Sequence, residues 1–319
     1  MALPVETLTQ MYETMWRIRH FEEAAGALYR AGRVKGGIHA SIGQEAVATG
    51  VCFALRPDDL ITSTHRGHGH HIAKGADMNR LMAELLGKAD GYNRGRGGSM
   101  HVAAFDVGSL GAFPVVAAGV PVAVGAALAV RMQGQDRAVV AFFGDGAVAQ
   151  GALHESINLA ALRKVPLVFV CENNQFAVST RHDAGLAIAD KARWAEAYGL
   201  PAWTVDGQDV EGVHAVAAEA VGRARDGGGP GFIEAVTYRF EGHYFGEPEV
   251  YRSREEVKAQ RQQHDPITLL HSRLIEAGAD PAELDRRKAR ALQAVEAALA
   301  FADASPEPDP ATFDDYVYA

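Results

Sequence analysis

Residues 138–176, AVVAFFGDGAVAQGALHESINLAALRKVPLVFVCENNQF, decide the fold of this chain. An apolar run, 138–143, stops at Gly144-Asp145-Gly146, and a second apolar run, 165–171, stops at Asn173-Asn174. The residues between these two runs have helical character. The stretch therefore predicts a strand, a turn, a helix, a second strand and a second turn.

The two turns are expected to meet. In a right-handed βαβ crossover the strands are parallel, so both turns emerge at the carboxyl edge of the sheet, where open α/β sheets bind ligands. Asp145 and Asn174 then face one another and offer the hard oxygen ligands that Mg²⁺ or Ca²⁺ prefers. Gly144 and Gly146 let backbone approach a ligand closely, and a helix expected to begin near Ala147 favours an anion at its amino end. This arrangement predicts a metal that bridges protein and phosphate.

Gly-Asp-Gly alone is also an ordinary turn sequence. Here it is followed, after the 26 residues 147–172, by a double asparagine. The combination resembles the thiamine diphosphate fingerprint. Within that superfamily the stretch resembles the alpha subunit of the decarboxylating component of 2-oxo acid dehydrogenase complexes, of the pyruvate and acetoin dehydrogenase type. The resemblance implies that Asp145, Asn174 and the backbone carbonyl of Phe176 hold Mg²⁺, which in turn holds the cofactor diphosphate.

Composition excludes several other classes of protein. The 319 residues are 48% hydrophobic and 22% charged, which is typical of a globular protein. A net charge of −9 argues against nucleic acid or an anionic membrane as a partner. Cys52 and Cys171 stand in apolar surroundings and predict a reducing compartment without disulfides. The first ten residues lack the features of a signal or transit peptide, so a cytoplasmic location is expected.

Strands alternate with helices along the chain, which predicts an α/β fold with a doubly wound, mostly parallel sheet flanked by helices. Three parts are expected: an N-terminal helical extension, 1–30, the cofactor-binding α/β domain, 31–260, and a C-terminal helical region and tail, 261–319. Residues 7–19 read as an amphipathic helix behind a Thr7/Gln10 capping pair. The uncharged run 114–130 reads as a buried helix that begins near Pro121.

Residues 64–75, THRGHGHHIAKG, concentrate four histidines and one arginine within seven positions. The spacing does not match the usual zinc patterns, and no cysteine or carboxylate shares the cluster. A cationic lining for an anion is the simpler interpretation, because the Arg66 guanidinium suits phosphate oxygens. The family has a Tyr-Arg pair here that contacts the diphosphate, and this chain has His65-Arg66, as expected of acetoin-type members.

Other segments extend the resemblance to the expected site. His39 follows Gly36-Gly37 on a turn and resembles the family's histidine that approaches the cofactor channel, which implies a catalytic role. Val116 lies in a stretch that contacts the cofactor in this family. Gly144, Gly146 and Ala147, which surround the expected metal ligand Asp145, are likewise implied to bind the cofactor. His243 alone could be a surface histidine. The resemblance implies that His243 contacts the diphosphate and acts in catalysis, and that Arg239 is a cation on the phosphate side.

The resemblance also implies a partner. In this superfamily a glutamate on a second domain type activates the cofactor pyrimidine, and in two-subunit relatives a beta subunit carries it. No segment of this chain reads as that domain. The chain is therefore expected to be inactive alone, to form an α2β2 heterotetramer, to cleave a small 2-oxo acid or acetoin, and to pass the acyl group to a lipoyl acyltransferase component.

Three alternatives remain open on the sequence. A branched-chain 2-oxo acid dehydrogenase alpha subunit carries the same motifs. One half of a split transketolase divides the same fold over two chains, although the loops that carry Arg66 and His243 fit it less well. A non-catalytic magnesium-phosphate binding module would need no beta subunit and would ignore thiamine.

Overall fold

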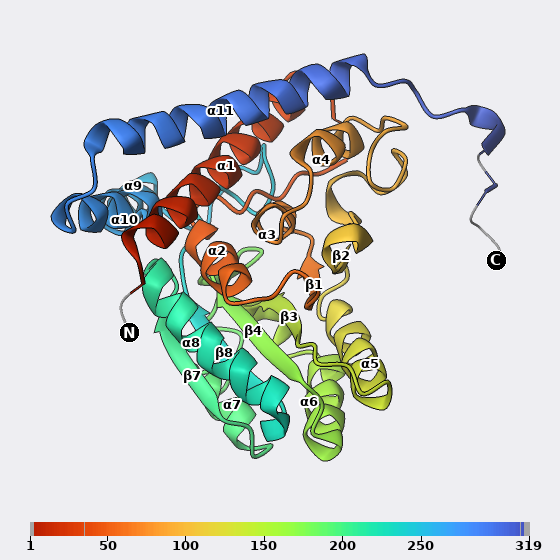
Figure 1. The fold of residues 1–319 in the computed structure, drawn as a ribbon, viewed down its shortest axis with the longest axis vertical. Coiled ribbons are helices and arrows are strands. Elements are labelled where there is room, and N and C mark those ends of the chain that lie inside the picture. The colour runs from red at the N-terminus through yellow and green to blue at the C-terminus, as the bar shows by residue number, and fades with distance from the viewer. Residues whose placement is uncertain (1–2, 35, 313, 316–319) are drawn as a thin grey trace.

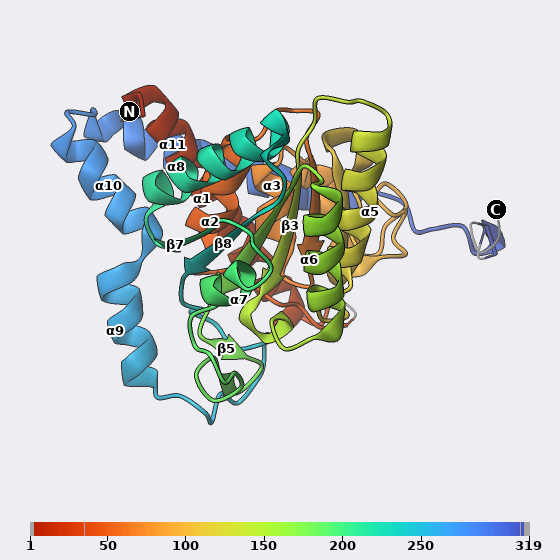
Figure 2. The same ribbon diagram turned by 90° about the horizontal axis from the view of Figure 1, so that it is seen from below.

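A six-stranded parallel sheet runs through the centre of the molecule (Figures 1 and 2). The computed structural model describes residues 3–34, 36–312 and 314–315. In spatial order the strands are β2 (Ser109–Phe113), β1 (Leu60–Thr64), β3 (Val139–Gly144), β4 (Leu167–Asn173), β8 (Gly231–Val236) and β7 (Ala202–Asp206). A separate antiparallel hairpin joins β5 (Phe176–Ala177) to β6 (Thr180–Arg181). The predicted α/β fold with a parallel sheet is confirmed.

Helices cover both faces of this sheet, and others pack beyond it. The helices of the described residues are α1 (Val5–Arg30), α2 (Glu45–Phe53), α3 (His68–Ala73), α4 (Met78–Leu85), α5 (Gly119–Met132), α6 (Gly151–Arg163), α7 (Ala192–Glu196), α8 (Val210–Arg223), α9 (Arg254–His264), α10 (Pro266–Glu276) and α11 (Pro281–Ala304). Among the described residues, no helix is both long enough and apolar enough to cross a membrane.

The side chains of strand β3 pack against helices on both faces of the sheet. Val139, Ala141 and Phe143 belong to a buried cluster with α5, α6 and α7, whereas Val140 and Phe142 belong to another with α2 and α8. Successive side chains of a strand point to opposite faces, so a strand that is apolar at every position must be covered on both. The continuous apolar runs of the sequence therefore correspond to central strands of a doubly wound sheet.

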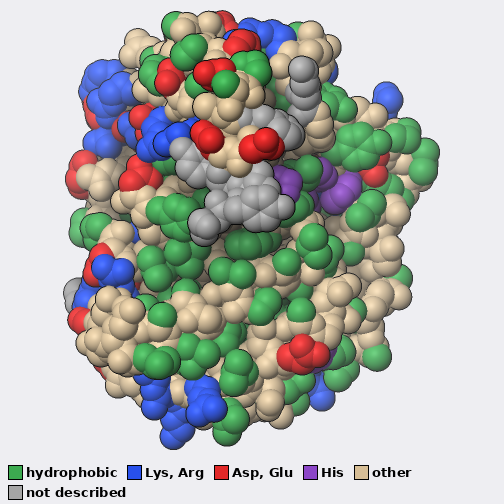
Figure 3. All heavy atoms as spheres, turned by 90° about the vertical axis from the view of Figure 1, so that its right-hand side faces the viewer, with side chains coloured by type: hydrophobic (Ala, Val, Ile, Leu, Met, Phe, Trp, Pro, Cys, Tyr) green, Lys and Arg blue, Asp and Glu red, His purple; other side chains and the backbone are tan. Residues whose placement is uncertain are grey.

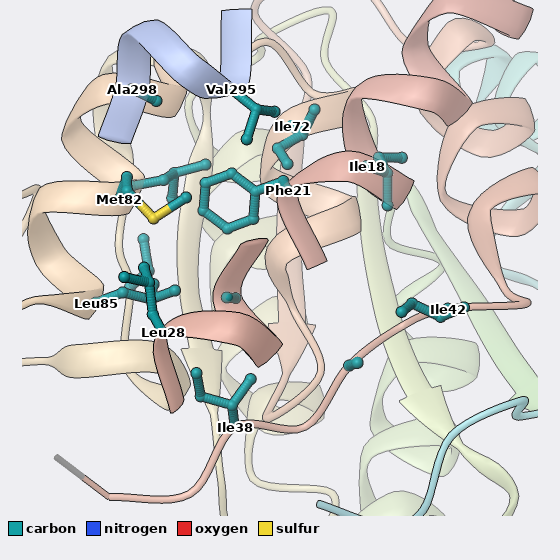
Figure 4. Close-up of a cluster of buried hydrophobic side chains, with 14 of the residues drawn as sticks. Ile18, Phe21, Leu28, Ile38, Ile42, Ile72, Met82, Leu85, Val295 and Ala298 are labelled. Carbon is teal, nitrogen blue, oxygen red and sulfur yellow. The ribbon is translucent and has the colours of Figure 1, made fainter. Parts of the chain in front are cut away.

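A further core lies beyond the sheet, where α1 and α11 run side by side (Figure 1). Figure 4 shows Phe21 of α1 among Ile72 of α3, Met82 of α4 and Val295 of α11. These side chains are buried, so the two terminal helices are held to the α/β core by apolar packing. The expected division into residues 1–30, 31–260 and 261–319 stays a prediction.

Two predicted helix starts were wrong. Helix α1 begins at Val5, so Thr7 lies inside its first turn and does not cap it. It also runs on to Arg30, because buried Phe21 and Leu28 continue its apolar spacing beyond residue 19. Helix α6 begins at Gly151 and not near residue 147, because Asp145–Ala147 form a 3-10 turn first.

Strand β2 was not predicted from the sequence, because Ser-Leu-Gly-Ala-Phe is short and contains a glycine. Strand β8 ends at Val236, and residues 237–240 form the segment that leads to the expected site. Both cysteines are buried and unpaired, as predicted.

Candidate active site

One cavity of about 180 Å³ lies at the carboxyl ends of the strands. Its walls come from the segments that follow β1, β2, β3, β4 and β8. From β1 the chain continues to β2 on one side of the sheet, and the later strands lie on the other side, beginning with β3. Such a switch point is where open α/β sheets bind ligands. The lining includes all the residues predicted to bind cofactor: His65, Arg66, Val116, Gly144, Asp145, Gly146, Ala147, Asn174, Phe176, Arg239 and His243.

Asp145 is a buried carboxylate, only 3% exposed. Strands β3 and β4 pair Gly144 with Glu172, which brings Asp145 next to the asparagines that follow β4. Burial raises the pKa of Asp145 to about 6, although the charge of Lys191 opposes this shift. The Lys191 Nζ lies 3.7 Å from Glu234 Oε1, so this buried cation is paired with another carboxylate. A carboxylate held in this way is suited to a divalent cation.

Asn174 and Phe176 complete the predicted metal-binding set. The Asn174 Nδ2 donates to Gln44 Oε1 at 3.0 Å, and the Phe176 N–H donates to Asn174 Oδ1 at 3.3 Å. The Phe176 carbonyl oxygen accepts a long hydrogen bond of 3.4 Å from Arg239 Nη1. The described residues hold no group of three His, Cys, Asp or Glu side chains placed to bind a metal. A metal here would use one carboxylate, one amide and one carbonyl.

The backbone around the cavity is strained. Ala117, Gln175 and Val178 have positive φ values of 66°, 76° and 55°, which non-glycine residues seldom adopt. Ala117 and Val178 line the cavity, and Gln175 lies between two expected metal ligands. Strain of this kind concentrates at binding sites.

The two glycines that flank Asp145 have different surroundings. A Cβ atom on Gly146 would lie 2.7 Å from the Ala177 Cβ, so this glycine is required for packing against the β5–β6 hairpin. A Cβ atom on Gly144 would have no neighbour within 4 Å. Gly144 therefore borders open space into which a ligand could fit.

Arg66 supplies a buried positive charge. Its Nη1 donates to the Ala40 carbonyl at 2.6 Å and its Nη2 to the His243 carbonyl at 3.3 Å, so its described partners are uncharged. Burial and the nearby charge of Arg239 lower the pKa of Arg66 to about 9, which leaves it protonated at neutral pH. A buried cation with no carboxylate partner is a site for an anion.

Three histidines form a cluster at the edge of this cavity. The His39 ring centroid lies 4.8 Å from that of His65 and 4.7 Å from that of His243, and the His65 and His243 centroids are 5.5 Å apart. Burial, followed by the charge of Arg66, lowers the pKa of His39 to about 3, of His65 to about 2 and of His243 to about 4. All three are neutral at pH 7. The Nδ1 atoms of His39 and His243 are buried and have no hydrogen-bond partner among the residues that the structure describes.

The other three histidines of the 65–71 cluster do not line the cavity. Helix α3 turns their rings into the protein. Their partners are Glu22 and Ser99 for His68, Ser63 and Glu172 for His70, and Ser109 for His71. Arg66 lines the cavity, as expected, whereas these three histidines do not, because α3 directs them to hydrogen-bond partners in the interior.

Several residues that line the cavity were not predicted from the sequence, among them Gln44 and Glu172. Gln44 lies immediately before α2 and reaches Asn174 across the cavity wall. Glu172 is the last residue before the double asparagine and lies 3.2 Å from His70 Nε2. A carboxylate at the end of an apolar strand was a usable signal for Glu172. Gln44 had none, because its contact is to a residue 130 positions away.

The chain is similar to known proteins along most of its length. The model of the dehydrogenase E1 component family matches residues 13–311. The chain is 42% identical to the alpha subunit of acetoin:2,6-dichlorophenolindophenol oxidoreductase of Bacillus subtilis, over 97% of this chain and 92% of that one. It is 41% identical to the alpha subunit of the pyruvate dehydrogenase E1 component of Rhizobium meliloti, over 93% and 86% of the two chains. The acetoin enzyme subunit of Cupriavidus necator is also 41% identical, over 97% and 94%. This chain belongs to the dehydrogenase E1 component family.

Proposed function

We propose that this chain is the alpha subunit of a thiamine diphosphate- and magnesium-dependent dehydrogenase that cleaves pyruvate or acetoin and passes the acyl group to a lipoyl-bearing partner. One observation carries the proposal. A buried carboxylate, Asp145, and a buried guanidinium, Arg66, line the same cavity, and neither is paired with an opposite charge among the described residues. A divalent cation and a diphosphate would supply both missing charges.

The residues present fit such a pair of ligands. Asp145, the amide oxygen of Asn174 and the carbonyl of Phe176 would hold the metal, and the carbonyl has a second lone pair besides the one that accepts from Arg239. The charges of Arg66 and Arg239 would meet the diphosphate, together with His65, His243 and backbone at Gly144, Gly146, Ala147 and Val116. Bound thiamine diphosphate supplies a carbon nucleophile and an electron sink.

His39 and His243 are proposed to act on protons in the reaction. Both are neutral at physiological pH, since burial and the charge of Arg66 keep each pKa far below 7. Each also has a buried Nδ1 without a described partner. A neutral imidazole can accept a proton or donate a hydrogen bond to a reacting oxygen.

A single titration tests the proposed function. The purified chain should bind thiamine diphosphate when Mg²⁺ is present and bind it far more weakly with a chelator, with calorimetry as the measurement. The non-catalytic module predicts a different result, namely equal binding of inorganic pyrophosphate and of the cofactor. Absence of any cofactor binding, in the presence of the beta subunit, would contradict the proposal.

Arg66→Met should weaken cofactor binding by about 10- to 150-fold, because a lost charge-assisted hydrogen bond costs about 1.5 to 3 kcal/mol. Arg223→Met is the matched control. The Arg223 guanidinium also donates to two backbone carbonyls, those of Gly229 and Pro230, but it lies outside the cavity. Equal affinity of the Arg66 variant and the wild type, in the same titration, would remove Arg66 from the binding site.

The partner subunit is proposed to cover the outer side of α5. Pro121, Val122 and Met132 are exposed on this helix, and Val115 and Val116 are exposed just before it. Figure 3 looks at the side of the molecule where α5 lies in Figure 1, and the lower part of this face carries many apolar side chains and few acidic ones. Contiguous apolar surface of this kind is typical of a permanent subunit contact. It supports a contact with a beta subunit. The α2β2 assembly and the lipoyl acyltransferase partner are proposed from the resemblance to the family, whose relatives are named as alpha subunits.

The substrate is proposed to be pyruvate or acetoin, since relatives of nearly equal similarity are named for each. A branched-chain 2-oxo acid remains the first alternative, and the substrate that reduces NAD in the reconstituted complex decides between them. A cytoplasmic location is proposed because two buried, unpaired cysteines suit a reducing compartment.

A further inference from the structure

Gln44 lines the cavity beside Asn174, one of the expected metal ligands. Its side chain is 1% exposed and lines the cavity. Its Oε1 accepts from Asn174 Nδ2 at 3.0 Å. Its Nε2 is buried and has no hydrogen-bond partner among the described residues. A buried amide N–H without an acceptor destabilises the folded state, so we expect a bound ligand to provide the acceptor for Gln44 Nε2.

The turn that carries Gln44 is held rigidly. Its backbone N–H donates to the Ser41 carbonyl at 2.9 Å. The neighbouring Glu45 is fully buried, accepts from the Gly43 N–H at 2.9 Å and pairs with Arg19 at 2.5 Å. Position 44 is therefore fixed by hydrogen bonds and an ion pair that do not involve the cavity.

We infer that Gln44 is a positioning residue that orients the Asn174 amide for metal binding. An asparagine can ligate a hard cation only through its oxygen, and its Nδ2 must then find an acceptor elsewhere. Gln44 Oε1 is that acceptor, and the Phe176 N–H on Oδ1 favours the same orientation. A phosphate oxygen in the cavity would accept from Gln44 Nε2 and fix the glutamine in turn. The hydrogen bonds are then donated from asparagine to glutamine and from glutamine to the anion, and the Asn174 oxygen faces the metal.

This inference rests on the proposed function, because it requires Mg²⁺ at Asn174. Residues that orient metal ligands typically contribute about 10- to 100-fold to metal affinity. Gln44→Met keeps the length of the side chain and removes both hydrogen-bonding ends. We expect it to raise the Kd for Mg²⁺ by about 10- to 100-fold at saturating thiamine diphosphate.

A double-mutant cycle separates the orienting effect of Gln44 on Asn174 from a general loss of stability. Asn174→Asp presents two equivalent oxygens, so orientation by Gln44 loses its importance. In that background Gln44→Met should change the Kd for Mg²⁺ by less than about threefold. Gln208→Met is the control, because Gln208 is also buried and bonds Thr237 and His264 outside the cavity. It should lower thermal stability and leave the metal affinity unchanged.

The measurements are titrations of the full chain with Mg²⁺, and tryptophan fluorescence reports the binding. Where a beta subunit co-purifies, the assembled complex is titrated. If the wild type binds no Mg²⁺ with thiamine diphosphate, the proposed function fails. If the wild type binds and Gln44→Met binds equally well, only the role of Gln44 fails. Equal losses from Gln44→Met in the wild-type chain and in the Asn174→Asp variant would likewise overturn the orienting role.

Discussion

The Asp145→Asn variant is expected to lose magnesium-dependent binding of thiamine diphosphate and, at the same time, to stabilise the cofactor-free protein. Asp145 is the only charged side chain in the proposed metal-binding set, so its removal leaves a hard divalent cation with neutral oxygens alone. The same carboxylate is 3% exposed, which makes its charge unfavourable for the ligand-free fold. Binding and stability should therefore change in opposite directions.

The pH dependence of this effect has a definite sign. The pKa of Asp145 is raised from 3.8 to about 6 in the folded chain. Between these values the folded state holds a proton that the unfolded state has released, so the free energy of unfolding falls as the pH rises. Above pH 6 the wild type has lost this contribution. The asparagine variant should then be more stable by on the order of 3 kcal/mol at pH 8, and by little at pH 4.

Thermal unfolding of both proteins at pH 4, 6 and 8, without cofactor, measures the stability. Calorimetric titration with Mg²⁺ and cofactor measures the binding, and wild-type affinity for Mg²⁺ should itself fall below about pH 6 as Asp145 takes up a proton. Asp206→Asn is the control, since Asp206 is an exposed carboxylate at the end of β7 outside the cavity. Undiminished binding in the Asp145 variant would contradict the metal assignment.

The purified chain alone is expected to show no turnover, and addition of a beta subunit is expected to restore it by several orders of magnitude. The cavity offers groups for a metal and a diphosphate, and the resemblance to the family implies that the pyrimidine-activating glutamate lies on a beta subunit. General acid-base groups of this kind typically contribute about 100- to 10,000-fold. A cofactor held by its diphosphate alone should therefore be bound but inactive.

The assay contains the chain, thiamine diphosphate, Mg²⁺, a candidate 2-oxo acid or acetoin, and an artificial electron acceptor, with and without the beta subunit. Val122→Arg tests the contact surface, because a charge on the exposed side of α5 should prevent assembly and leave cofactor binding by the alpha chain detectable. Leu292→Arg, a similar change at an exposed position of α11, is the control. Sustained turnover by the lone chain would refute the two-subunit proposal.

The sequence determined the architecture because the relevant signals are local. Two apolar runs that end in Gly-Asp-Gly and Asn-Asn, with a helix between them, require parallel strands that are buried on both faces. Strands β3 and β4 have this arrangement, and Asp145 and Asn174 line one cavity as predicted. The start of α6 was placed four residues too early, because a 3-10 turn and the first turn of a helix look alike in sequence.

Tertiary structure alone decided which neighbours each polar side chain meets. His65, His68, His70 and His71 look equivalent in sequence, yet only His65 lines the cavity, because α3 turns the other rings toward interior partners. The low pKa values at the site also arise from burial and from the charge of Arg66, which depend on the whole fold. The hydrogen bond from Asn174 to Gln44 joins residues 130 positions apart, a separation that no local pattern encodes.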